Sequence, residues 1–550
     1  MGPFVIGAIF FYGGLVSAAV VRSRCGVEQG RSRSMRNHIR FIRKGQIVEL
    51  SDVSPTETLL DYLRLRERSC GTKEGCAEGD CGACTVAVGR LRAGRIVYEP
   101  INSCIALLGM MDGLEIVTVD DLAPSDEHLH PVQSALVSAH ASQCGFCTPG
   151  FVMSLFALYH SRQRADRSLV NDWLAGNLCR CTGYRPIADA ALAACTGEPD
   201  DAFSRRSAKT HALLESLIDD HDIRIGDDES FFAAPASEDA LVSLLERHKD
   251  ATIVGGATDV GLWITKQLRS LPQIVHTGRV ASMHEVIVDD DRIEIGGAVT
   301  YAEAEAALAR IDPDIEELLR RLGSKQVRSL GTIGGNIANG SPIGDSPPWL
   351  IVLGAQVELR RGDARRRLPL EDFFIDYGRQ DRALGEILLR IVVPRPAANE
   401  HFRCYKISKR FDQDISAVLG AFLFRIEKGR VVHARMALGG MAAIPKRAFH
   451  VEGALVGCEI DDPDARARAM DLAAKEWERD FSPIDDHRAS AAYRLQVSHS
   501  LLTKALNEVA DRPTSDMRLI DRRDLHRIEI GDLNNSHDSH PNAMDPGSPR

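Results

Sequence analysis

Residues 75–86 read GCAEGDCGACTV and place Cys76, Cys81 and Cys84 at the spacing C-x4-C-x2-C. A fourth cysteine, Cys104, follows in the segment NSCI. This spacing is typical of plant-type [2Fe–2S] ligation by four thiolates. Glycines inside the loop allow the backbone to wrap closely and to point N–H groups at the sulfur atoms. The stretch therefore predicts an iron–sulfur loop within a small ferredoxin-like domain.

A structural zinc site is the alternative for this loop. Zinc usually takes two short cysteine pairs on separate knuckles, whereas this segment supplies three cysteines in one loop and one remote ligand. The pattern therefore favours iron–sulfur over zinc. Cys70, six residues before Cys76, is interpreted as an ordinary thiol.

Two further motifs, QCGFCTPG at residues 143–150 and NLCRCTGYRP at residues 177–186, supply Cys144, Cys147, Cys179 and Cys181. Each cysteine pair precedes a predicted helix start marked by Thr and then Pro, where free N–H groups stabilise an anionic cluster. Zinc is again the alternative for an isolated C-x2-C pair. The C-x-C half, beside a plant-type loop, favours a second [2Fe–2S] centre. Two one-electron centres in succession would form a short electron-transfer path.

The segments around these motifs have distinct patterns. Residues 35–50 alternate apolar and polar side chains around Lys44-Gly45, which predicts a β-hairpin. A helix opened by Pro55 and strands at 85–88 and 115–119 follow. Residues 131–195 predict a four-helix bundle, with Thr148 and Pro149 as N-cap and first residue of its second helix. Its cysteines occupy the turns between helices one and two and between helices three and four.

The second half of the chain predicts a different architecture. Residues 197–225 are polar and predict a linker with one helix around 211–218. An α/β pattern begins at Phe231, with helices near 237–248 and 301–310 and a strand at 251–254. Residues 400–510 are rich in strands and end in helices.

The expected fold class is α+β multidomain, and its parts follow in chain order. They are a non-native or disordered leader (1–34), a β-grasp ferredoxin-like [2Fe–2S] domain (35–120), a four-helix [2Fe–2S] domain (121–200), a linker (201–225), an α/β domain (226–399), a C-terminal α+β domain (400–510) and a disordered tail (511–550).

Composition limits the possible functions. The chain has 550 residues, with 67 Lys+Arg against 77 Asp+Glu, and the net charge of −10 argues against nucleic-acid binding. Eight of its 13 cysteines lie in the two clusters, which indicates metal ligands in a reducing compartment, so a cytoplasmic location is expected. Residues 1–21 carry no charge, and they suggest either an over-extended reading frame before Met35 or a membrane anchor. The need for reduced thiols favours the first interpretation, with no membrane association.

Taken together, the two cysteine motifs resemble the iron–sulfur region of the xanthine oxidase family of molybdenum hydroxylases. The resemblance covers roughly residues 35–510, and the cysteine motifs are highly specific for it. Because the same chain also contains a flavin region, it is similar to the small subunits of the bacterial xanthine dehydrogenases, which belong to this family. The resemblance implies that the helical-domain cluster lies nearest the molybdenum cofactor, with Gln143 close to its pterin.

Two glycine-rich loops carry the flavin part of the resemblance. Residues 252–259 read TIVGGATD, a strand running into a turn that differs from the Rossmann fingerprint. Residues 329–345 read SLGTIGGNIANGSPIGD, whose small residues allow close approach to a pyrophosphate. Together they resemble the vanillyl-alcohol-oxidase-like FAD domain of the family. The resemblance implies an FAD-binding domain over residues 226–399 and the C-terminal domain of the flavoprotein part over residues 400–510. By position, the resemblance implies FAD contacts from Thr252, Ile253, Val254, Gly255, Gly256, Ala257, Thr258, Asp259, Leu322, Gly331, Thr332, Ile333, Gly334, Gly335, Asp345, Leu388 and Lys406. His276 and His284 have no motif support and are interpreted as structural.

The resemblance implies an oxidoreductase subunit that transfers electrons. A molybdopterin-binding large subunit would bind the purine and convert hypoxanthine and xanthine to urate. Its electrons would pass through both clusters to FAD and on to NAD+, within a heterotetramer built as a dimer of heterodimers. The cysteines are ligands, so no catalytic residue is expected here. The alternatives are the matching subunit of an aldehyde or N-heterocycle dehydrogenase, and a stand-alone iron–sulfur and flavin electron carrier or assembly scaffold.

Overall fold

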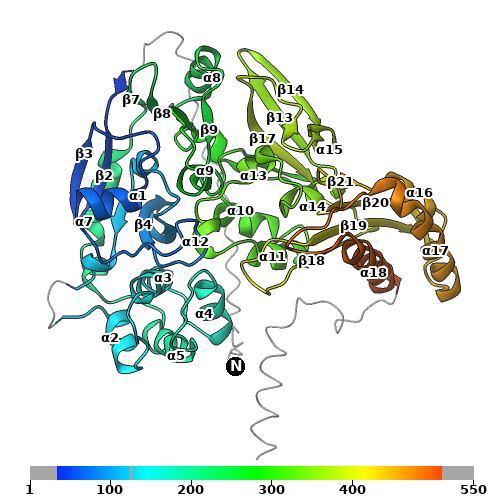
Figure 1. Cartoon of the computed structure of the whole chain (residues 1–550), viewed down its shortest axis with the longest axis horizontal. Coiled ribbons are helices and arrows are strands. Elements are labelled where there is room, and N and C mark those ends of the chain that lie inside the picture. Colours follow the sequence, from blue (N-terminus) through cyan, green and yellow to red (C-terminus); the bar gives the residue numbers. More distant parts are fainter. Residues whose placement is uncertain (1–33, 124–127, 511–550) are drawn as a thin grey trace, which may run out of the picture.

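The computed structural model describes residues 34–123 and 128–510 (Figure 1). The expected tail and the expected leader, apart from Ser34, lie outside these residues. Within the described ranges, no helix has both the length and the apolar character needed to cross a membrane. The multidomain α+β fold class predicted from the sequence is confirmed.

The predicted hairpin opens a mixed five-stranded sheet, in which Lys44 and Gly45 form the turn with positive φ. Its strand order is β3-β2-β6-β4-β5, and only β2 and β6 pair in parallel. Phe41, Leu63 and Val86 lie in the core beneath it. The strands are β2 (Ile39–Arg43), β3 (Gln46–Leu50), β4 (Thr85–Arg92), β5 (Arg95–Asn102) and β6 (Glu115–Val117).

The helix predicted from Pro55 begins later, at Leu59. Its first turn, α1 (Leu59–Asp61), continues as the π-helical η1 (Tyr62–Arg66). The start is fixed by Thr58, whose side chain accepts a hydrogen bond from the Asp61 N–H at 3.1 Å.

Four helices form the next unit, which lies below the ferredoxin-like sheet in Figure 1. The central α3 is buried from Gly150 to Tyr159 and packs against β4. The N-cap of α3 is Cys147, so the prediction of Thr148 as N-cap was wrong by one residue. The cysteine ahead of the threonine already has helical backbone angles. The helices are α2 (Pro131–Ser138), α3 (Thr148–His160), α4 (Arg167–Leu174) and α5 (Arg185–Ala194).

The expected linker contains regular structure. It includes α6 (Ala202–Arg205), α7 (Ser207–Leu217) and most of β7 (Asp222–Gly226). Leu214 and Leu217 of α7 pack against Ile42 of the ferredoxin-like sheet.

The flavin region contains two five-stranded sheets. In the first, of order β1-β7-β8-β10-β9, strands β8, β10 and β9 run in parallel. Its β1 (Met35–Arg36) comes from the chain segment just before the ferredoxin-like hairpin and pairs with β7. The other elements of this layer are β8 (Phe231–Ala234), α8 (Glu238–Arg247), β9 (Thr252–Val254), α9 (Val260–Thr265), β10 (Gln273–His276) and η4 (Ala281–His284).

The second sheet has the order β11-β12-β17-β13-β14 and is antiparallel. Helices between β12 and β13 cover it and share its core. The strands are β11 (Val286–Val288), β12 (Arg292–Gly296), β13 (Gln356–Arg361), β14 (Ala364–Pro369) and β17 (Ile387–Pro394). The helices are α10 (Tyr301–Leu308), α11 (Pro313–Arg320), α12 (Lys325–Arg328), α13 (Ile333–Asn339) and α14 (Ser346–Val352), followed by α15 (Leu370–Phe373) and the small hairpin of β15 (Phe374–Asp376) and β16 (Arg379–Gln380).

The C-terminal unit is a four-stranded sheet covered by helices, at the right of Figure 1. Trp477 is fully buried in its core. The elements are β18 (Glu400–Ile407), β19 (Val418–Glu427), β20 (Arg430–Gly439), β21 (Lys446–Arg447), α16 (Phe449–Leu455), α17 (Pro463–Asp480) and α18 (Ala491–Ala510).

A buried ion-pair clamp joins the ferredoxin-like and flavin units. The Arg36 guanidinium contacts both carboxylate oxygens of Asp112, at 2.6 and 2.9 Å. Arg279 of the flavin region pairs with Asp112 and with Asp219, each at 2.5 Å. One apolar core also crosses this junction and includes Phe41 and Phe232. The two units therefore form one continuous body.

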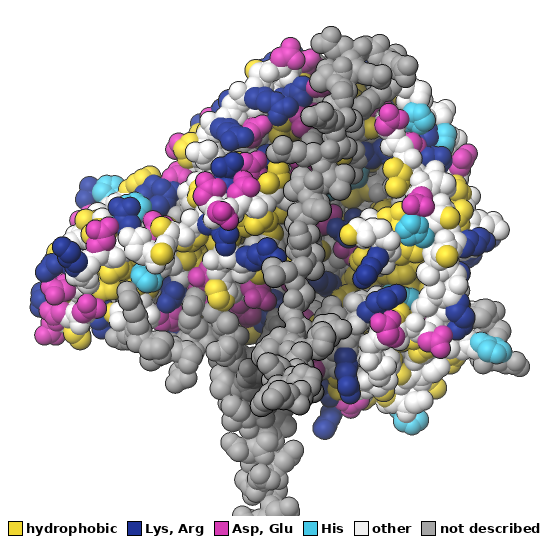
Figure 2. Space-filling view, turned by 180° about the vertical axis from the view of Figure 1, so that it is seen from behind, with side chains coloured by type: hydrophobic (Ala, Val, Ile, Leu, Met, Phe, Trp, Pro, Cys, Tyr) yellow, Lys and Arg dark blue, Asp and Glu magenta, His cyan; other side chains and the backbone are white. Residues whose placement is uncertain are grey.

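Figure 2 shows the opposite face of the molecule from Figure 1. Basic and acidic side chains of the described residues are interspersed over it. Such a surface offers mixed charge rather than the continuous basic stripe that tracks a phosphate backbone.

Candidate functional site

The cysteines of the first motif converge, although they lie in loops at two places in the chain. The Sγ atoms of Cys84 and Cys104 are 3.2 Å apart, and the thiol of Cys76 contacts those of Cys81 and Cys104. Cys84 and Cys104 are almost fully buried, whereas the other two are half-buried. We call Cys76, Cys81, Cys84 and Cys104 the inner quartet.

The loop of the inner quartet directs backbone N–H groups at sulfur. The N–H groups of Cys81 and Glu78 donate to the Cys76 Sγ, at 3.3 and 3.4 Å. Gly79 and Gly82 have positive φ, which lets the chain turn this tightly. The thiols of Cys104 and Cys81, with these N–H groups, hold the pKa of Cys76 far below its ordinary value. Four convergent sulfurs and inward N–H groups fit an anionic iron–sulfur cluster.

The cysteines of the second motif meet at the starts of two helices. The side chains of Cys147 and Cys179 contact each other, as do those of Cys144 and Cys181. Both the N–H and the hydroxyl of Thr182 donate to the Cys179 Sγ, at 3.5 and 3.2 Å. We call Cys144, Cys147, Cys179 and Cys181 the surface quartet. Its donor set also fits a [2Fe–2S] cluster, because helix N-termini favour negative charge.

The surface quartet lies at the outside of the molecule. Cys144 and Cys181 are exposed, and so are Gln143 and Arg180 beside them. Three large apolar or aromatic side chains near these cysteines are also exposed. They are Phe146 (47%), Leu178 (41%) and Tyr184 (43%).

The two quartets are joined by a backbone hydrogen bond. The N–H of Leu178, the residue before Cys179, donates to the carbonyl oxygen of Cys81 at 3.0 Å. The ligand loops of the two motifs are therefore in direct contact.

The inner quartet also contacts the flavin region. Leu262 of α9 packs in a small core with Cys84, Cys104 and Ile105. The Thr265 hydroxyl donates to the Ala77 carbonyl at 2.7 Å. Helix α9 directly follows the loop of residues 255–259.

The two glycine loops predicted to hold the flavin touch each other. A Cβ on Gly256 would lie 1.8 Å from the Leu330 carbonyl oxygen, and one on Gly255 would lie 2.6 Å from the Thr332 hydroxyl. Ala257 is buried and has a φ of 59°, a strained angle for a non-glycine residue. Thr332 caps α13, because its hydroxyl accepts the Gly335 N–H at 3.0 Å. Only glycine fits at these close approaches, so the two loops pack directly against each other.

The remaining predicted flavin residues lie in several places. Lys406 Nζ and Asp345 Oδ2 form a buried ion pair at 2.6 Å, and the Ser416 hydroxyl donates to the other Asp345 oxygen. Leu322 and Leu388 lie in the main apolar core of the flavin region. Thr258 lies against Gly331, while Thr252, Ile253 and Val254 form β9, which leads into the first loop. Asp259 is the N-cap of α9, and Ile333 and Gly334 open α13.

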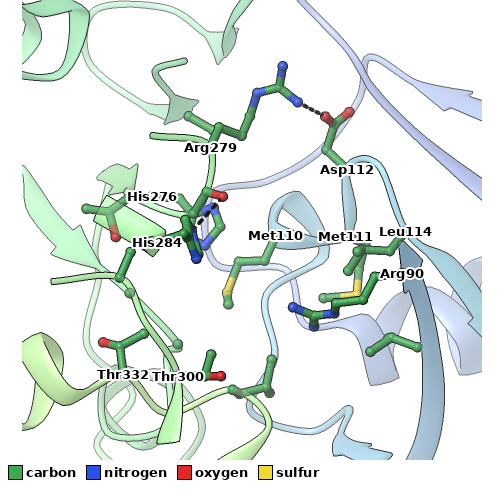
Figure 3. Close-up of a pocket in the computed structure, with 18 of the residues that line it drawn as sticks. Arg90, Met110, Met111, Asp112, Leu114, His276, Arg279, His284, Thr300 and Thr332 are labelled. Atoms are coloured by element: carbon green, nitrogen blue, oxygen red, sulfur yellow. Dashed lines mark hydrogen bonds and ion pairs between the residues drawn. The ribbon is translucent and has the colours of Figure 1, made fainter. Parts of the chain in front are cut away.

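A cavity of about 110 Å³ extends from these loops to the ferredoxin-like unit (Figure 3). The flavin loops contribute Gly255, Gly256 and Thr332, and the ferredoxin-like unit contributes Arg90 and Met110.

His276 and His284, interpreted from sequence as structural, both line this cavity (Figure 3). Burial lowers the pKa of His276 to about 4, so its imidazole is neutral at pH 7. His276 ends β10 beside the end of β9, at the carboxyl edge of parallel strands where ligands commonly bind. That position is the signal that sequence reasoning could have used.

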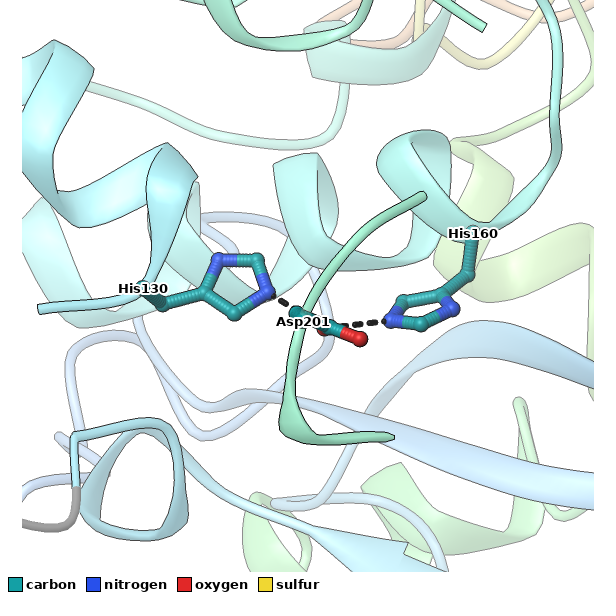
Figure 4. Close-up of side chains that lie close together, drawn as sticks. All are labelled: His130, His160 and Asp201. Atoms are coloured by element: carbon teal, nitrogen blue, oxygen red, sulfur yellow. Dashed lines mark hydrogen bonds and ion pairs between the residues drawn. The ribbon is translucent and has the colours of Figure 1, made fainter. Parts of the chain in front are cut away.

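A second cluster that sequence reasoning missed joins His130, His160 and Asp201 (Figure 4). Both imidazoles contact the same Asp201 oxygen through Nε2, at 2.8 and 2.9 Å. The Nδ1 of His130 accepts the Val132 N–H, so its proton lies on Nε2 and points at Asp201. A metal would have to displace that proton. The geometry therefore fits a hydrogen-bonded clasp that ties α2, α3 and α6 together.

Four family models match the chain in succession. They are "2Fe-2S iron-sulfur cluster binding domain" over residues 41–107, "[2Fe-2S] binding domain" over 118–192, "FAD binding domain in molybdopterin dehydrogenase" over 227–396 and "CO dehydrogenase flavoprotein C-terminal domain" over 403–509.

Curated relatives include xanthine dehydrogenases from animals, plants and fungi. The enzyme from Drosophila subobscura is 32% identical over 73% of this chain and 34% of its own length. Xanthine dehydrogenase 2 of Arabidopsis thaliana is 31% identical over 73% and 35%, respectively. This chain thus spans about a third of the length of the relatives it matches.

Among solved structures, reconstituted CO dehydrogenase from Oligotropha carboxidovorans is 25% identical with a TM-score of 0.48, over 52% of this chain and 99% of that one.

The two cysteine quartets, the flavin loops and the four matching models define an iron–sulfur flavoprotein with two [2Fe–2S] domains and an FAD-binding domain. More narrowly, the chain belongs to the xanthine oxidase family of molybdenum hydroxylases, as the cysteine motifs predicted. It corresponds to the electron-transfer region of these oxidoreductases.

Proposed function

We propose that this chain is the electron-transfer subunit of a xanthine dehydrogenase. It passes electrons from a molybdenum site on a partner chain through the surface quartet, the inner quartet and FAD to NAD+. The observation that carries this proposal is the order of contacts. Leu178 beside Cys179 bonds to Cys81, and the inner quartet packs on α9, which follows the first flavin loop.

The eight cysteines supply the ligands of two [2Fe–2S] clusters. When bound, the clusters and FAD supply one-electron transfer and its conversion to hydride transfer. The protein holds the thiolates with inward N–H groups and keeps water from Cys84 and Cys104 by burial. The difference in burial gives the two sites different surroundings, which sets different potentials.

FAD lies along the two glycine loops in this proposal. Gly255, Gly256 and Gly335 let the backbone of the two loops and the Thr332 side chain pack closely, and the pyrophosphate would bind the backbone N–H groups of these loops. The Asp345–Lys406 pair gives a buried polar group that can orient the nucleotide. The cavity beside His276 extends the site toward Met110.

The partner carries the molybdenum cofactor and the purine site. The exposed Phe146, Leu178 and Tyr184 around the surface quartet support this, because apolar side chains beside a redox centre suit docking of another chain. Gln143 and Arg180 add polar contacts at the same place. We further infer a heterotetramer with two copies of each chain, NAD+ as acceptor, and a cytoplasmic site, where thiols stay reduced.

The decisive experiment is purification of the tagged chain from its own cells, followed by metal and flavin analysis. We expect about four irons and one FAD per chain, together with a large chain that contains molybdenum. The complex should reduce NAD+ with xanthine, whereas this chain alone should only pass electrons from NADH to a dye. Xanthine turnover by the chain alone, free of molybdenum, would overturn the assignment of roles.

A further inference from the structure

Gln326 lies where the ferredoxin-like, helical and flavin units meet. It belongs to α12 of the flavin region, which Figure 1 shows between β4 and α4. Its side chain is fully buried. Its Nε2 carries two hydrogens and lies within donor distance of three acceptors: the Thr85 hydroxyl at 3.2 Å, the Ser154 hydroxyl at 3.1 Å and Asn177 Oδ1 at 3.0 Å. One side chain of the flavin region thus holds both iron–sulfur units.

Hydrogen bonds link each acceptor of Gln326 to the carbonyl of Gly82, which lies between Cys81 and Cys84 in the sequence. The Thr85 hydroxyl donates to the Gly82 carbonyl at 2.7 Å, and Asn177 Nδ2 donates to the same oxygen at 3.2 Å. The Ser154 hydroxyl donates to Asn177 Oδ1 at 2.7 Å. Because Oδ1 receives both Ser154 and Gln326, the amide of Asn177 is fixed with its Nδ2 toward Gly82.

Three glycines make this contact possible. A Cβ on Gly82 would lie 2.2 Å from the Gly176 carbonyl oxygen, and one on Gly150 would lie 2.1 Å from the Gly82 carbonyl oxygen. A Cβ on Gly176 would lie 2.2 Å from Gln326 Oε1. The backbones of the two ligand loops are therefore as close as the chain permits, with Gln326 packed directly on them.

This network borders the Leu178–Cys81 hydrogen bond. Asn177 immediately precedes Leu178, and Gly82 immediately follows Cys81. The residues that Gln326 holds are thus the chain neighbours of the two bonded groups. Through this bond a short chain path runs from Cys179 in one quartet to Cys81 in the other.

We propose that Gln326 is a positioning residue that fixes the electronic coupling between the two iron–sulfur clusters, although it belongs to neither iron–sulfur unit. The inference rests on the proposed function, because it requires a cluster in each quartet. Each transfer moves one electron from one centre to the other, with no bond formed or broken and no proton moved. The coupling depends on the Leu178–Cys81 contact, and Gln326 keeps that contact in one geometry.

The test compares Gln326→Leu and Gln326→Asn with the wild-type chain, all loaded with iron and reduced by dithionite. Low-temperature electron paramagnetic resonance reports the magnetic interaction between the reduced centres. We expect the splitting from this interaction in the wild-type chain, its loss in Gln326→Leu and partial retention in Gln326→Asn, whose shorter amide can keep some of its contacts. Amide exchange at Leu178 should be faster by roughly tenfold in Gln326→Leu.

The matched control is Gln413→Leu. Gln413 also bridges two units, since its Nε2 donates to the Asp80 carbonyl of the ferredoxin-like unit at 2.6 Å. Its splitting should equal that of the wild type. Iron content separates the possible failures. If the wild type lacks either cluster, the proposed function fails. If Gln326→Leu and Gln326→Asn hold about four irons and keep the full splitting, the positioning role is wrong even if they melt at lower temperature.

Discussion

Cys70 and Cys76 are six residues apart, yet only Cys76 meets other cysteines of its motif. Cys70 is exposed, and its sulfur faces the Arg64 carbonyl instead. The conformation of the loop therefore decides which cysteines come together as candidate ligands. The spacing of the motif predicted this arrangement.

A first prediction follows for single cysteines. Cys76→Ser and Cys179→Ser should each remove one of two distinct paramagnetic signals and lower the iron content from about four to about two per chain. Cys70→Ser is the matched control and should keep both signals. Two tightly bound zinc ions per chain, with no iron after anaerobic preparation, would contradict the assignment of these cysteines.

A second prediction concerns Asp201 in the clasp of Figure 4. Burial alone would raise its pKa, but hydrogen bonds from His130 and His160 outweigh burial, and the pKa lies well below its ordinary value. An Asp in the unfolded chain has a pKa of about 3.9. Because the pKa of Asp201 is lower in the folded protein, its ionised carboxylate stabilises the fold at pH values above about 3.9, and this stability is lost as the pH falls below that value. Asp201→Asn should therefore cost roughly 1.5–3 kcal/mol at pH 7 and lose less stability than wild type below pH ~4.

Thermal melts at pH 7 and along an acid series would measure this effect. Asp200→Asn is the control, because the Asp200 side chain is 89% exposed and forms a surface ion pair with Arg205. Parallel acid profiles for Asp201→Asn and the wild type would show that the clasp does not carry the acid sensitivity.

At the scale of elements, α3 connects two of the features described above. It begins next to Cys147 in the surface quartet and ends at His160 in the clasp. Its buried length makes it a rigid spacer, so the clasp can hold the quartet in place from the far end of the helix.

A third prediction concerns the contact between the two flavin loops. Gly256→Ala places a Cβ 1.8 Å from a backbone oxygen, which cannot move without opening the loops. We expect FAD affinity to fall about ten- to a hundredfold, since overpacking of this kind costs roughly 1–3 kcal/mol. Gly453→Ala, in α16 with nothing within 4 Å of the new Cβ, is the control. Fluorescence titration with FAD would detect the difference, and equal affinities would place the flavin elsewhere.

At the scale of the whole molecule, the clamp around Asp112 gives a fourth prediction. A chain that begins at Met35 keeps β1 and Arg36, whereas one that begins at His38 loses both. Removing one partner of a buried pair costs about 3–5 kcal/mol, so the shorter chain should melt roughly 3–5 °C lower. The Met35 chain should bind FAD and melt like the full chain. Equal melting of all three would show that β1 and Arg36 add nothing to stability.

The sequence predicted those parts of the fold and site that depend on local pattern. Cysteine spacing, the Lys44-Gly45 turn and helix α8 are of this kind. Gln326, Asp201 and the partnership of β1 with β7 escaped prediction, because each depends on residues far away in the chain. A glutamine in a short helix carries no signal until its three acceptors are placed around it. Helix α1 begins at Leu59 because Thr58 caps it, whereas the sequence pattern placed the start at Pro55.

The path of the chain between α7 and β7 has a consequence for how the molecule could be divided. Residues 218–221 connect α7, which packs on the ferredoxin-like sheet, to β7 of the flavin sheet. The two connected parts also share an apolar core and the ion-pair clamp. This loop acts as a tether that keeps the two faces at millimolar effective concentration. A protease cut there would leave two fragments that still fit each other, and their docking would become a bimolecular equilibrium that dilution can reverse.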